Sequence, residues 1–227
     1  MAYNIKHGRG MDGVVDLQRI AAVIRAQSPD IVALQEVDFG CRRSGEVDQP
    51  RVLGELCGMH YVFGEIRPYD GGRYGMAMLS RHAILDATVV AVQADSWPRF
   101  ALEVGIALPG DGARLVVTGV HLYRTEAERL AQARVLVTRR TNDLGPLIAG
   151  DFNSERGSNV MRQFEDGWAN PPKDEPAGTF PSPAPVKEID FVLVPVDPRI
   201  EVLRSSVVPE SIASDHRAIV LDLLVTR

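Results

Sequence analysis

Residues 100–108 carry an apolar side chain at every second position from Phe100 to Leu108. Such alternation is typical of a strand with one buried face. The turn-forming residues 109–112, Pro-Gly-Asp-Gly, separate this strand from a second apolar segment at 114–120. The two segments are therefore predicted to form a β-hairpin. Strands joined by a short turn pair antiparallel, which excludes a doubly wound parallel sheet.

Further strands are predicted on both sides of this hairpin. They cover residues 1–5, 31–34, 75–79, 84–92, 146–149, 190–194, 200–208 and 217–225. Apolar residues at helical spacing predict a helix over 14–27, and Thr125 with Glu128 predicts a capping box that opens a second helix over 126–140. The proline-rich segment 154–188 is predicted to be irregular, as either a functional or a mobile loop. We therefore expect an α+β fold: a two-sheet, mainly antiparallel β-sandwich flanked by helices.

The composition is that of a globular protein, with 45% hydrophobic and 24% charged residues in a chain of 227. We expect residues 1–227 to form a single, monomeric domain. The only cysteines, Cys41 and Cys57, exclude a disulfide framework and lack zinc-ligand spacing. No apolar run is long enough for a membrane span, and no signal-peptide core is visible. We expect a cytoplasmic protein, or a secreted or membrane-associated one if a segment ahead of Met1 has been removed.

Polar residues recur at the ends of the predicted strands. They are Asn4, Glu36, His121, Asp151, Asn153, Asp190, Asp215 and His216. Taken singly, each has an ordinary explanation: residues 151–154 suit a turn, and most glutamates are simply solvated. The repetition favours one shared site, because strand ends of a packed sheet hold side chains rigidly.

Hydrolysis of a phosphate ester is the chemistry that fits these residues. Carboxylate and amide oxygens suit Mg²⁺, with Mn²⁺ as the alternative, and the ion would also bind phosphate oxygens. An aspartate can orient or deprotonate a water molecule. A histidine paired with an aspartate can donate to a phosphate oxygen.

At this point the sequence resembles the endonuclease/exonuclease/phosphatase superfamily. Its members include pancreatic-type deoxyribonucleases, exonuclease III-like abasic-site endonucleases, inositol polyphosphate 5-phosphatases and bacterial sphingomyelinases. The matching segments, in the family's order, are 3–5, 34–38, 74–80, 118–122, 150–154, 189–193 and 214–216. The resemblance implies a four-layer αββα catalytic domain. One departure is Met76, where many relatives carry an asparagine that contacts phosphate.

The resemblance also implies a role for each matching residue. Glu36 resembles the principal metal ligand, with Asn4 and Asp215 beside it. Asn4, Arg73 and Tyr74 are expected to contact the phosphate. The catalytic residues are expected to be Asp151, which activates water, Asn153, which holds the phosphate, the Asp190–His216 pair, and the second histidine, His121.

Several functions stay open at this stage. We expect a divalent-metal-dependent phosphodiesterase whose substrate is a small molecule, a lipid headgroup or a nucleic acid. The net charge of −5 lowers the expectation of a long polyanionic substrate. The alternatives are a nuclease acting on DNA or RNA, a phosphomonoesterase, and a catalytically silent binding protein. Segments 38–50 and 154–188 are expected to flank the site and determine substrate choice.

Overall fold

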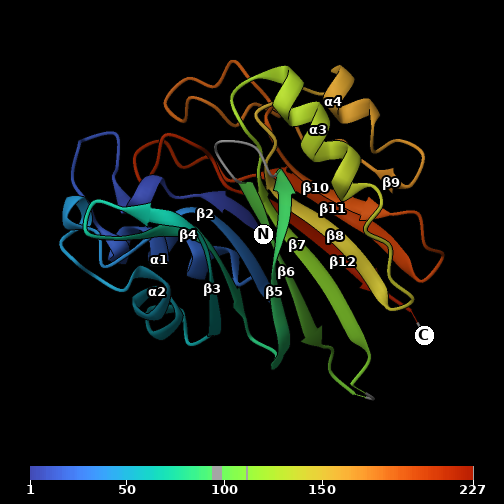
Figure 1. Cartoon of the computed structure of the whole chain (residues 1–227), viewed down its shortest axis with the longest axis horizontal. Helices are drawn as coiled ribbons and strands as arrows, with labels where there is room; N and C mark the ends of the chain where they lie inside the picture. Colours follow the sequence, from blue (N-terminus) through green and yellow to red (C-terminus); the bar gives the residue numbers. More distant parts are fainter. Residues whose placement is uncertain (94–98, 111, 227) are drawn as a thin grey trace.

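The computed structural model describes residues 1–93, 99–110 and 112–226, which form two six-stranded sheets packed face to face (Figure 1). The first sheet has the order β11 (Ile200–Val207), β12 (Ile219–Val225), β1 (Ala2–Asn4), β2 (Ile31–Phe39), β4 (Gly72–Ser80), β3 (His60–Tyr69). The second has the order β5 (Ile84–Gln93), β6 (Arg99–Ala107), β7 (Arg114–His121), β8 (Leu144–Asp151), β10 (Asp190–Pro195), β9 (Trp168–Ala169).

Both sheets are mixed. β1 pairs parallel with β2, and β7 pairs parallel with β8, whereas the other pairs are antiparallel. The predicted hairpin is confirmed by the antiparallel pairing of β6 with β7, although Asp111 in its turn lies outside the described residues. Because the parallel pairs run in the same direction, their carboxyl ends meet at one end of the sandwich, and this end carries the predicted polar residues.

Helices cover the two outer faces of the sandwich (Figure 1). α1 (Leu17–Gln27) and α2 (Gln49–Cys57) pack on the first sheet through a buried cluster that includes Ile20, Ile24 and Leu53. α3 (Glu126–Leu136) and α4 (Asn159–Arg162) pack on the second sheet through a cluster that includes Leu136 and Phe164. A third cluster fills the space between the sheets. The predicted sandwich with helices outside is therefore correct.

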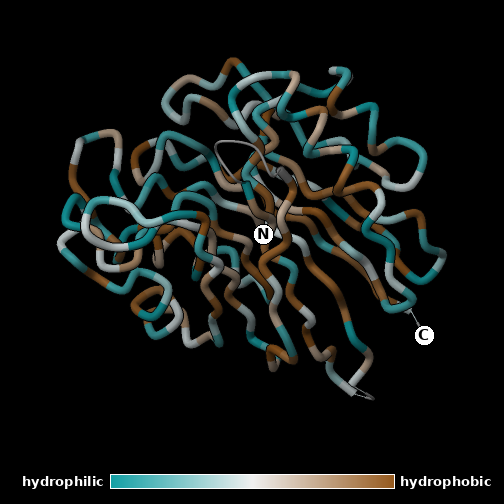
Figure 2. The backbone as a smooth tube through the Cα atoms, in the orientation of Figure 1, coloured by the Kyte–Doolittle hydropathy of each residue, from teal (hydrophilic) through white to brown (hydrophobic). Residues whose placement is uncertain are grey.

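Hydrophobic residues are concentrated along the strands, whereas the outer loops are mostly hydrophilic (Figure 2). This distribution follows from the alternation that predicted the strands, since each strand turns one set of side chains into a buried cluster. None of the helices in the described part of the chain is both long and apolar enough to cross a membrane.

The structure corrects several predicted boundaries. α1 begins after Asp16, whose carboxylate caps the helix by accepting from Arg19 N at 3.1 Å, and α3 ends at Leu136 instead of residue 140. α2 and β3 were absent from the prediction. A signal for α2 is present, because Asp48 caps it and Pro50 lies in its first turn.

Candidate active site

Four strand ends, a bulge within β2 and the two segments that follow β8 and precede β12 bring the predicted polar residues together. Asn4 ends β1, His121 ends β7 and Asp151 ends β8, whereas Asp190 begins β10. β10 runs antiparallel to β8, and Asp190 lies directly opposite Asp151 in the register. β7 and β8 are parallel, and His121 lies beside Asp151. The two strands on either side of β8 therefore each place a polar side chain next to Asp151: His121 from β7 and Asp190 from β10.

Gly150 permits this close approach of β7 and β8. A Cβ atom at Gly150 would lie 2.0 Å from the carbonyl oxygen of Val120, a separation that no side chain tolerates. Glycine is therefore required immediately before Asp151 for steric reasons. This steric need explains why the Gly-Asp-Phe-Asn motif, which is part of the family resemblance, begins with glycine.

Glu36 is presented by an irregularity in β2. The register between β2 and β4 shifts between Leu34 and Val37, and Glu36 has a φ of 56°. A left-handed conformation is uncommon for a residue other than glycine, and it often marks a functional position. A bulge of this kind redirects one side chain without ending the strand. It aims the partly exposed Glu36 at the fully buried Asn4.

Asn4 links the two sheets at the centre of the site. Its Nδ2 donates to Glu36 Oε1 and to Asp151 Oδ2, both at 3.2 Å. Its Oδ1 accepts from Lys6 N at 3.1 Å. The side chain is fully buried, so its orientation is fixed by these three partners. The position of Asn4 therefore places the carboxylates of Glu36 and Asp151 side by side.

Asp151 is buried, with 2% of its surface exposed, and its Oδ1 accepts from Asn153 N at 2.8 Å. Its Oδ2 lies 3.6 Å from His121 Nε2 and 3.8 Å from His216 Nε2. Burial raises the pKa of Asp151, and the charge of Asp190 raises it further, while the two histidines oppose this shift. A carboxylate that takes up a proton this readily is suited to act as a base.

Asn153 lies beside Asp151, but not as part of an extended strand. β8 ends at Asp151, and Asn153 has a left-handed φ of 48°. Its Nδ2 donates to Leu122 O at 2.9 Å. One N–H of the amide is therefore used within the protein, and the remaining N–H is the one that can reach a substrate.

His216 and Asp190 form the predicted pair. His216 Nδ1 lies 3.0 Å from Asp190 Oδ2, and both side chains are buried. Burial alone lowers the pKa of His216, but the charge of Asp190 and the hydrogen bond to it, helped by Asp151 and Asp215, raise that pKa to about 10. The imidazole is therefore protonated at neutral pH and donates through Nδ1 to Asp190.

His121 and Tyr74 form the opposite wall of the site. Tyr74 Oη lies 3.4 Å from His121 Nδ1. Tyr74 is buried, and burial together with the charge of Glu36 raises its pKa well above the usual range. The phenol is therefore neutral and can orient the histidine through a hydrogen bond.

Two predicted residues have other partners in the structure. Asp215 lies 2.8 Å from Lys6 Nζ, so its charge is already balanced. Arg73 lies next to Tyr74 on β4 but on the opposite face, because successive side chains of a strand alternate. Its guanidinium stacks on the Phe39 ring at 3.9 Å and lies 3.7 Å from Glu65. The structure therefore does not bring Arg73 into the cluster around Asp151.

The donor set fits a divalent cation that prefers oxygen ligands. Glu36 offers a carboxylate that is partly exposed, and Asn4 holds it beside Asp151. A second group, Asp151, Asp190 and His216, has ligand atoms within 4.8 Å of one another and could hold a metal ion.

The sequence did not predict that the irregular segment preceding β10 also anchors the Asp190–His216 pair. Thr179 is buried there, and its Oγ1 accepts from Ile189 N at 3.2 Å and from Asp190 N at 3.4 Å. The Phe180 ring lies 4.8 Å from the His216 ring. Proline content suggested a loop, but nothing in the pattern indicated which of its residues are buried against the Asp190–His216 pair.

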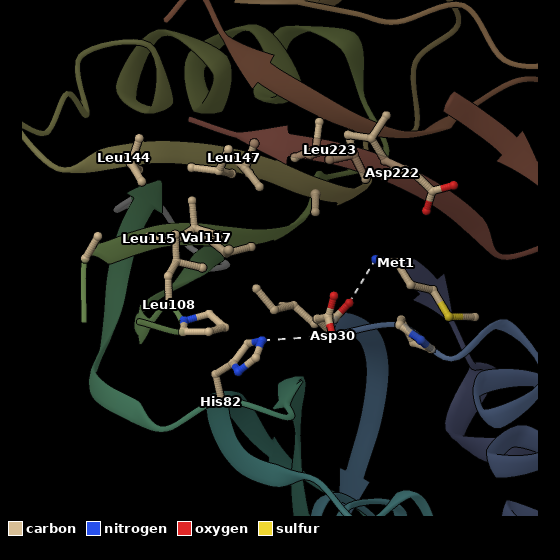
Figure 3. A pocket seen from close by; sticks show the side chains of 18 of the residues that line it. Met1, Asp30, His82, Leu108, Leu115, Val117, Leu144, Leu147, Asp222 and Leu223 are labelled. Carbon is tan, nitrogen blue, oxygen red and sulfur yellow. Dashed lines mark hydrogen bonds and ion pairs between the residues drawn. The ribbon is translucent and has the colours of Figure 1, made fainter. Parts of the chain in front are cut away.

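A cleft of about 510 Å³ opens beside the cluster, lined by residues that include Asn153, Phe180 and His216. A larger cavity of about 740 Å³ lies between the sheets at the other end of the strands (Figure 3). Its lining includes Leu115 and Leu147 and none of the clustered polar residues. The smaller cleft is therefore the one that a reacting group would enter.

Comparisons with known proteins agree with this geometry. A sequence profile described as the endonuclease/exonuclease/phosphatase family matches residues 1–216. Among curated proteins, none matches the chain. An endonuclease/exonuclease/phosphatase from Beutenbergia cavernae DSM 12333 has a similar structure, with a TM-score of 0.81 and 27% identity over 99% of this chain and 70% of that one.

Two further structures are similar at lower identity. Mannosyl-6-phosphatase Bt3783 of Bacteroides thetaiotaomicron VPI-5482 has a TM-score of 0.80 and 18% identity over 98% of each chain. The human Nocturnin catalytic domain with bound sulfate has a TM-score of 0.74 and 20% identity over 99% of this chain and 93% of that one. At these identities the likeness shows the fold alone.

Proposed function

Since this chain belongs to the endonuclease/exonuclease/phosphatase family, we propose that it hydrolyses phosphodiesters with the help of a divalent metal ion. The surroundings of Asp151 carry the proposal. Its Oδ2 lies 3.2 Å from Asn4 Nδ2, 3.6 Å from His121 Nε2 and 3.8 Å from His216 Nε2. A buried carboxylate between two imidazoles and an amide is suited to general-base work in hydrolysis.

Glu36 is the proposed metal ligand, with Mg²⁺ or Mn²⁺ as the ion. The carboxylate is aimed into the site by the β2 bulge and is partly exposed, so one face is available to a ligand. When bound, the ion would neutralise charge on the phosphate and on the leaving oxygen. Asn4 positions Glu36, because one amide nitrogen donates to both Glu36 and Asp151.

Asp151 is proposed to hold and deprotonate the attacking water. Its Oδ1 is occupied by Asn153 N at 2.8 Å, so Oδ2 is the oxygen that would take the proton. Burial and the charge of Asp190 raise the pKa of Asp151, which makes it a stronger base than an exposed aspartate. Asn153 would use its remaining N–H to hold a phosphate oxygen next to this water.

His216 is proposed to donate a proton or a hydrogen bond to the phosphate. Its Nδ1 is bound to Asp190 at 3.0 Å, which leaves Nε2–H for the substrate. Because Asp190 keeps the imidazole protonated, this donor carries a positive charge when the phosphate gains negative charge during the reaction. His121, fixed by Tyr74 at 3.4 Å, is placed to assist the leaving oxygen from the other side of Asp151.

Before a metal ion binds, the site holds more carboxylates than cations. Its four carboxylates are those of Glu36, Asp151, Asp190 and Asp215, and among the described residues Lys6 and His216 are the cations that contact them. A divalent ion on Glu36 would offset this surplus, so the substrate test has to separate a diester, which brings one negative charge, from a monoester, which brings nearly two at neutral pH. Since similar structures include a phosphatase, both ester classes belong in the test.

The experiment is a substrate panel with the purified protein. Bis(p-nitrophenyl) phosphate, p-nitrophenyl phosphate, plasmid DNA, single-stranded RNA and sphingomyelin are compared with Mg²⁺, with Mn²⁺ and with chelator. Asp151→Ala is the test variant. Asp174→Asn serves as the control, because Asp174 is 58% exposed and pairs with Arg204 outside the site. Metal-dependent diester cleavage that Asp151→Ala abolishes and Asp174→Asn retains supports the proposal. Cleavage that persists in chelator, or in Asp151→Ala, contradicts it.

A further inference from the structure

The cleft of about 510 Å³ beside the clustered polar residues extends beyond Asn153 and His216. Its lining also includes three basic residues and two carboxylates, which are Arg124, Arg129, Lys187, Glu126 and Glu155. Together with the protonated His216, the cations outnumber the carboxylates. A cleft whose walls carry an excess of one charge attracts groups of the opposite charge. The charge of this cleft therefore favours an anionic occupant.

One wall of the cleft continues from the ends of β7 and β8. The segments that follow these parallel strands stay together, because Leu122 N donates to Asp151 O and Leu122 O accepts from Asn153 Nδ2, both at 2.9 Å. Arg124 follows Leu122 by two residues, and Ser154 follows Asn153 directly. Arg124 and Ser154 therefore line the cleft immediately beyond the residues proposed to hold the reacting phosphate.

A second wall is a short hairpin that carries Lys187. Phe180 and Lys187 pair antiparallel, with Phe180 N donating to Lys187 O at 3.1 Å and Lys187 N donating to Phe180 O at 2.9 Å. Residues paired in this way present their side chains on the same face. The Phe180 ring lies 4.8 Å from the His216 ring. Lys187 therefore projects beside Phe180, one side chain away from His216.

Arg124 and Lys187 differ from the neighbouring cations in having no counter-ion. Both side chains are exposed, and in the part of the chain that the structure describes no carboxylate lies within ion-pair distance of either. By contrast, Arg156 and Lys173 share the carboxylate of Glu188, with Arg156 Nη2 at 2.9 Å and Lys173 Nζ at 2.6 Å from Oε1. The charges of Arg124 and Lys187 are therefore not yet balanced by the protein.

Ser154 provides an independent indication of a ligand. It lines the cleft with only 4% of its surface exposed, and its Oγ has no hydrogen-bond partner among the described residues. A buried hydroxyl without a partner is destabilising. Ser182, which is buried in the segment before β10, shows the usual arrangement, because its Oγ donates to Ser214 O at 2.6 Å. An oxygen atom of a ligand in the cleft would supply the acceptor that Ser154 lacks.

We propose that Lys187, Arg124 and Ser154 bind a second phosphate group of the substrate, so that the enzyme prefers phosphodiesters in which one ester arm carries a further phosphate. The proposal rests on the function proposed above, because it takes the reacting phosphate to lie at the Asn153–His216 end of the cleft. Lys187 and Arg124 would donate charge-assisted hydrogen bonds, and Ser154 would donate a neutral one. A small bisphosphorylated compound and a nucleotide chain both present such a group, and the substrates below separate these sources.

The test uses two pairs of substrates that differ only in the second anion. In the small pair, p-nitrophenyl propyl phosphate is compared with p-nitrophenyl 3-phosphonopropyl phosphate. In the nucleotide pair, the p-nitrophenyl ester of thymidine 5′-phosphate is compared with the same ester carrying a 3′-methylphosphate. We expect kcat/KM to rise about tenfold or more within at least one pair, because one hydrogen bond to a charged group contributes about that factor. The pair with the larger gain identifies the source.

Lys187→Met and Arg124→Met are the test variants, because methionine keeps a long side chain and removes the charge. Each should remove most of the gain within a pair, and Lys187→Arg should keep most of it. Ser154→Ala should lower the gain without lowering the melting temperature, since its hydroxyl has no partner among the described residues to lose. Arg134→Met is the matched control: Arg134 is exposed on α3 and lies outside the lining of the cleft, so the parent's gain should remain.

A binding measurement tests the cleft apart from turnover. Calorimetric titration without added metal compares propane-1,3-bisphosphonate with propylphosphonate. The bisphosphonate should bind about tenfold more tightly to the parent protein, and Lys187→Met should remove this difference. Equal kcat/KM within both pairs together with equal affinities would overturn the second phosphate site and leave the proposed hydrolase intact. Preferential binding of the bisphosphonate without hydrolysis of any ester would keep the site and overturn the proposed activity.

Discussion

Asp190 and His216 form a buried pair, with Oδ2 of the aspartate 3.0 Å from Nδ1 of the histidine. Asp190 starts β10, whereas His216 lies in the loop before β12, so the pair joins one sheet to the approach to the other. The pKa of His216 is raised to about 10, because Asp190 and its neighbours outweigh the effect of burial. The pair therefore links stability to pH in a way that can be measured.

The substitution Asp190→Asn should remove most of the pH dependence of stability that comes from His216. The folded-state pKa of His216 is about 10, above an unfolded value near 6.5. The resulting stabilisation is fully present below about pH 6.5 and is lost as pH rises through about 10. The free energy of unfolding of the variant should be lower by about 3 kcal/mol at pH 6, with the difference shrinking towards pH 9.5. Urea denaturation of both proteins at several pH values measures it.

The same variant should move the alkaline limit of activity to lower pH. Without the carboxylate charge, the imidazole loses its proton at a lower pH, and the donor proposed for the phosphate disappears with it. His60→Asn is the control, because His60 is exposed at the start of β3. A stability difference that stays constant between pH 6 and 9.5 would show that Asp190 does not hold the proton on His216.

The sequence predicted those parts of the fold that follow from local residue patterns and from the rules of strand pairing. The alternation of 100–108 predicted β6 within one residue at each end. The Asp190–His216 pair was predicted through the resemblance, and both residues lie where it placed them. The parallel pairing of β1 with β2 was not predicted, because it depends on contacts between segments about 30 residues apart and leaves no local signal.

The site was less predictable where it depends on side-chain direction. Arg73 and Tyr74 are adjacent in sequence, yet only Tyr74 contacts His121, because alternation sends them to opposite faces. The pairing of Asp215 with Lys6 at 2.8 Å depends on how a loop before β12 approaches the turn after β1. Tertiary packing determines these contacts. The sequence alone therefore predicted that Arg73 and Asp215 lie near the site, but it did not predict which residues they contact.

Thr179→Val should destabilise the protein and disturb Asp190. The threonine is fully buried, and its Oγ1 accepts from the backbone N–H groups of Ile189 and Asp190. Valine has the same shape but no acceptor, so two buried donors lose their partner, at a cost of about 1–3 kcal/mol. Thermal unfolding measures the loss, and Thr226→Val, near the exposed end of the chain, is the control. Equal melting temperatures would contradict the anchoring role.

Thr179 also changes an expectation about its loop. The sequence predicted that segment 154–188 flanks the site and determines substrate choice, and it gave the segment no part in stability. Ser182 is buried as well, and its hydroxyl donates to Ser214 O at 2.6 Å. We therefore expect a short linker in place of this segment to destabilise the fold and to displace His216, as thermal unfolding of the replacement protein would show.

Glu36→Gln should weaken metal binding more than it weakens the fold. Glu36 is partly exposed and accepts a hydrogen bond from the neutral amide of Asn4 at 3.2 Å, so an amide in its place fits with little loss of stability. Loss of the charge should raise the Mg²⁺ concentration for half-maximal activity by tenfold or more, and chelation should abolish parent activity reversibly. Glu65→Gln, whose partner is Arg73, is the control. An unchanged metal requirement in Glu36→Gln would assign the ion to other ligands.

Asp151→Asn should reduce turnover far more than it reduces metal or substrate binding. The amide keeps the shape of the side chain, and its oxygen can still accept from Asn153 N, but it cannot take a proton from water. Loss of a general base typically costs about 10²–10⁴-fold. Turnover at saturating Mg²⁺ and substrate is the decisive measurement, with metal affinity measured separately by calorimetry, because the amide could also disturb Glu36 through their shared partner Asn4.

The acid side of the pH profile provides the second readout for the same residue. Burial and the charge of Asp190 raise the pKa of Asp151, so parent activity should fall on acidification at a pH above the ordinary aspartate value of about 3.9. In Asp151→Asn this acid limb should disappear from the residual activity, because no group of that pKa remains to be protonated. Asp151 would be excluded as the base if the variant kept the same acid limb and turned over within about tenfold of the parent, which is less than the usual contribution of a general base. His121 would then be the residue placed to act as the base.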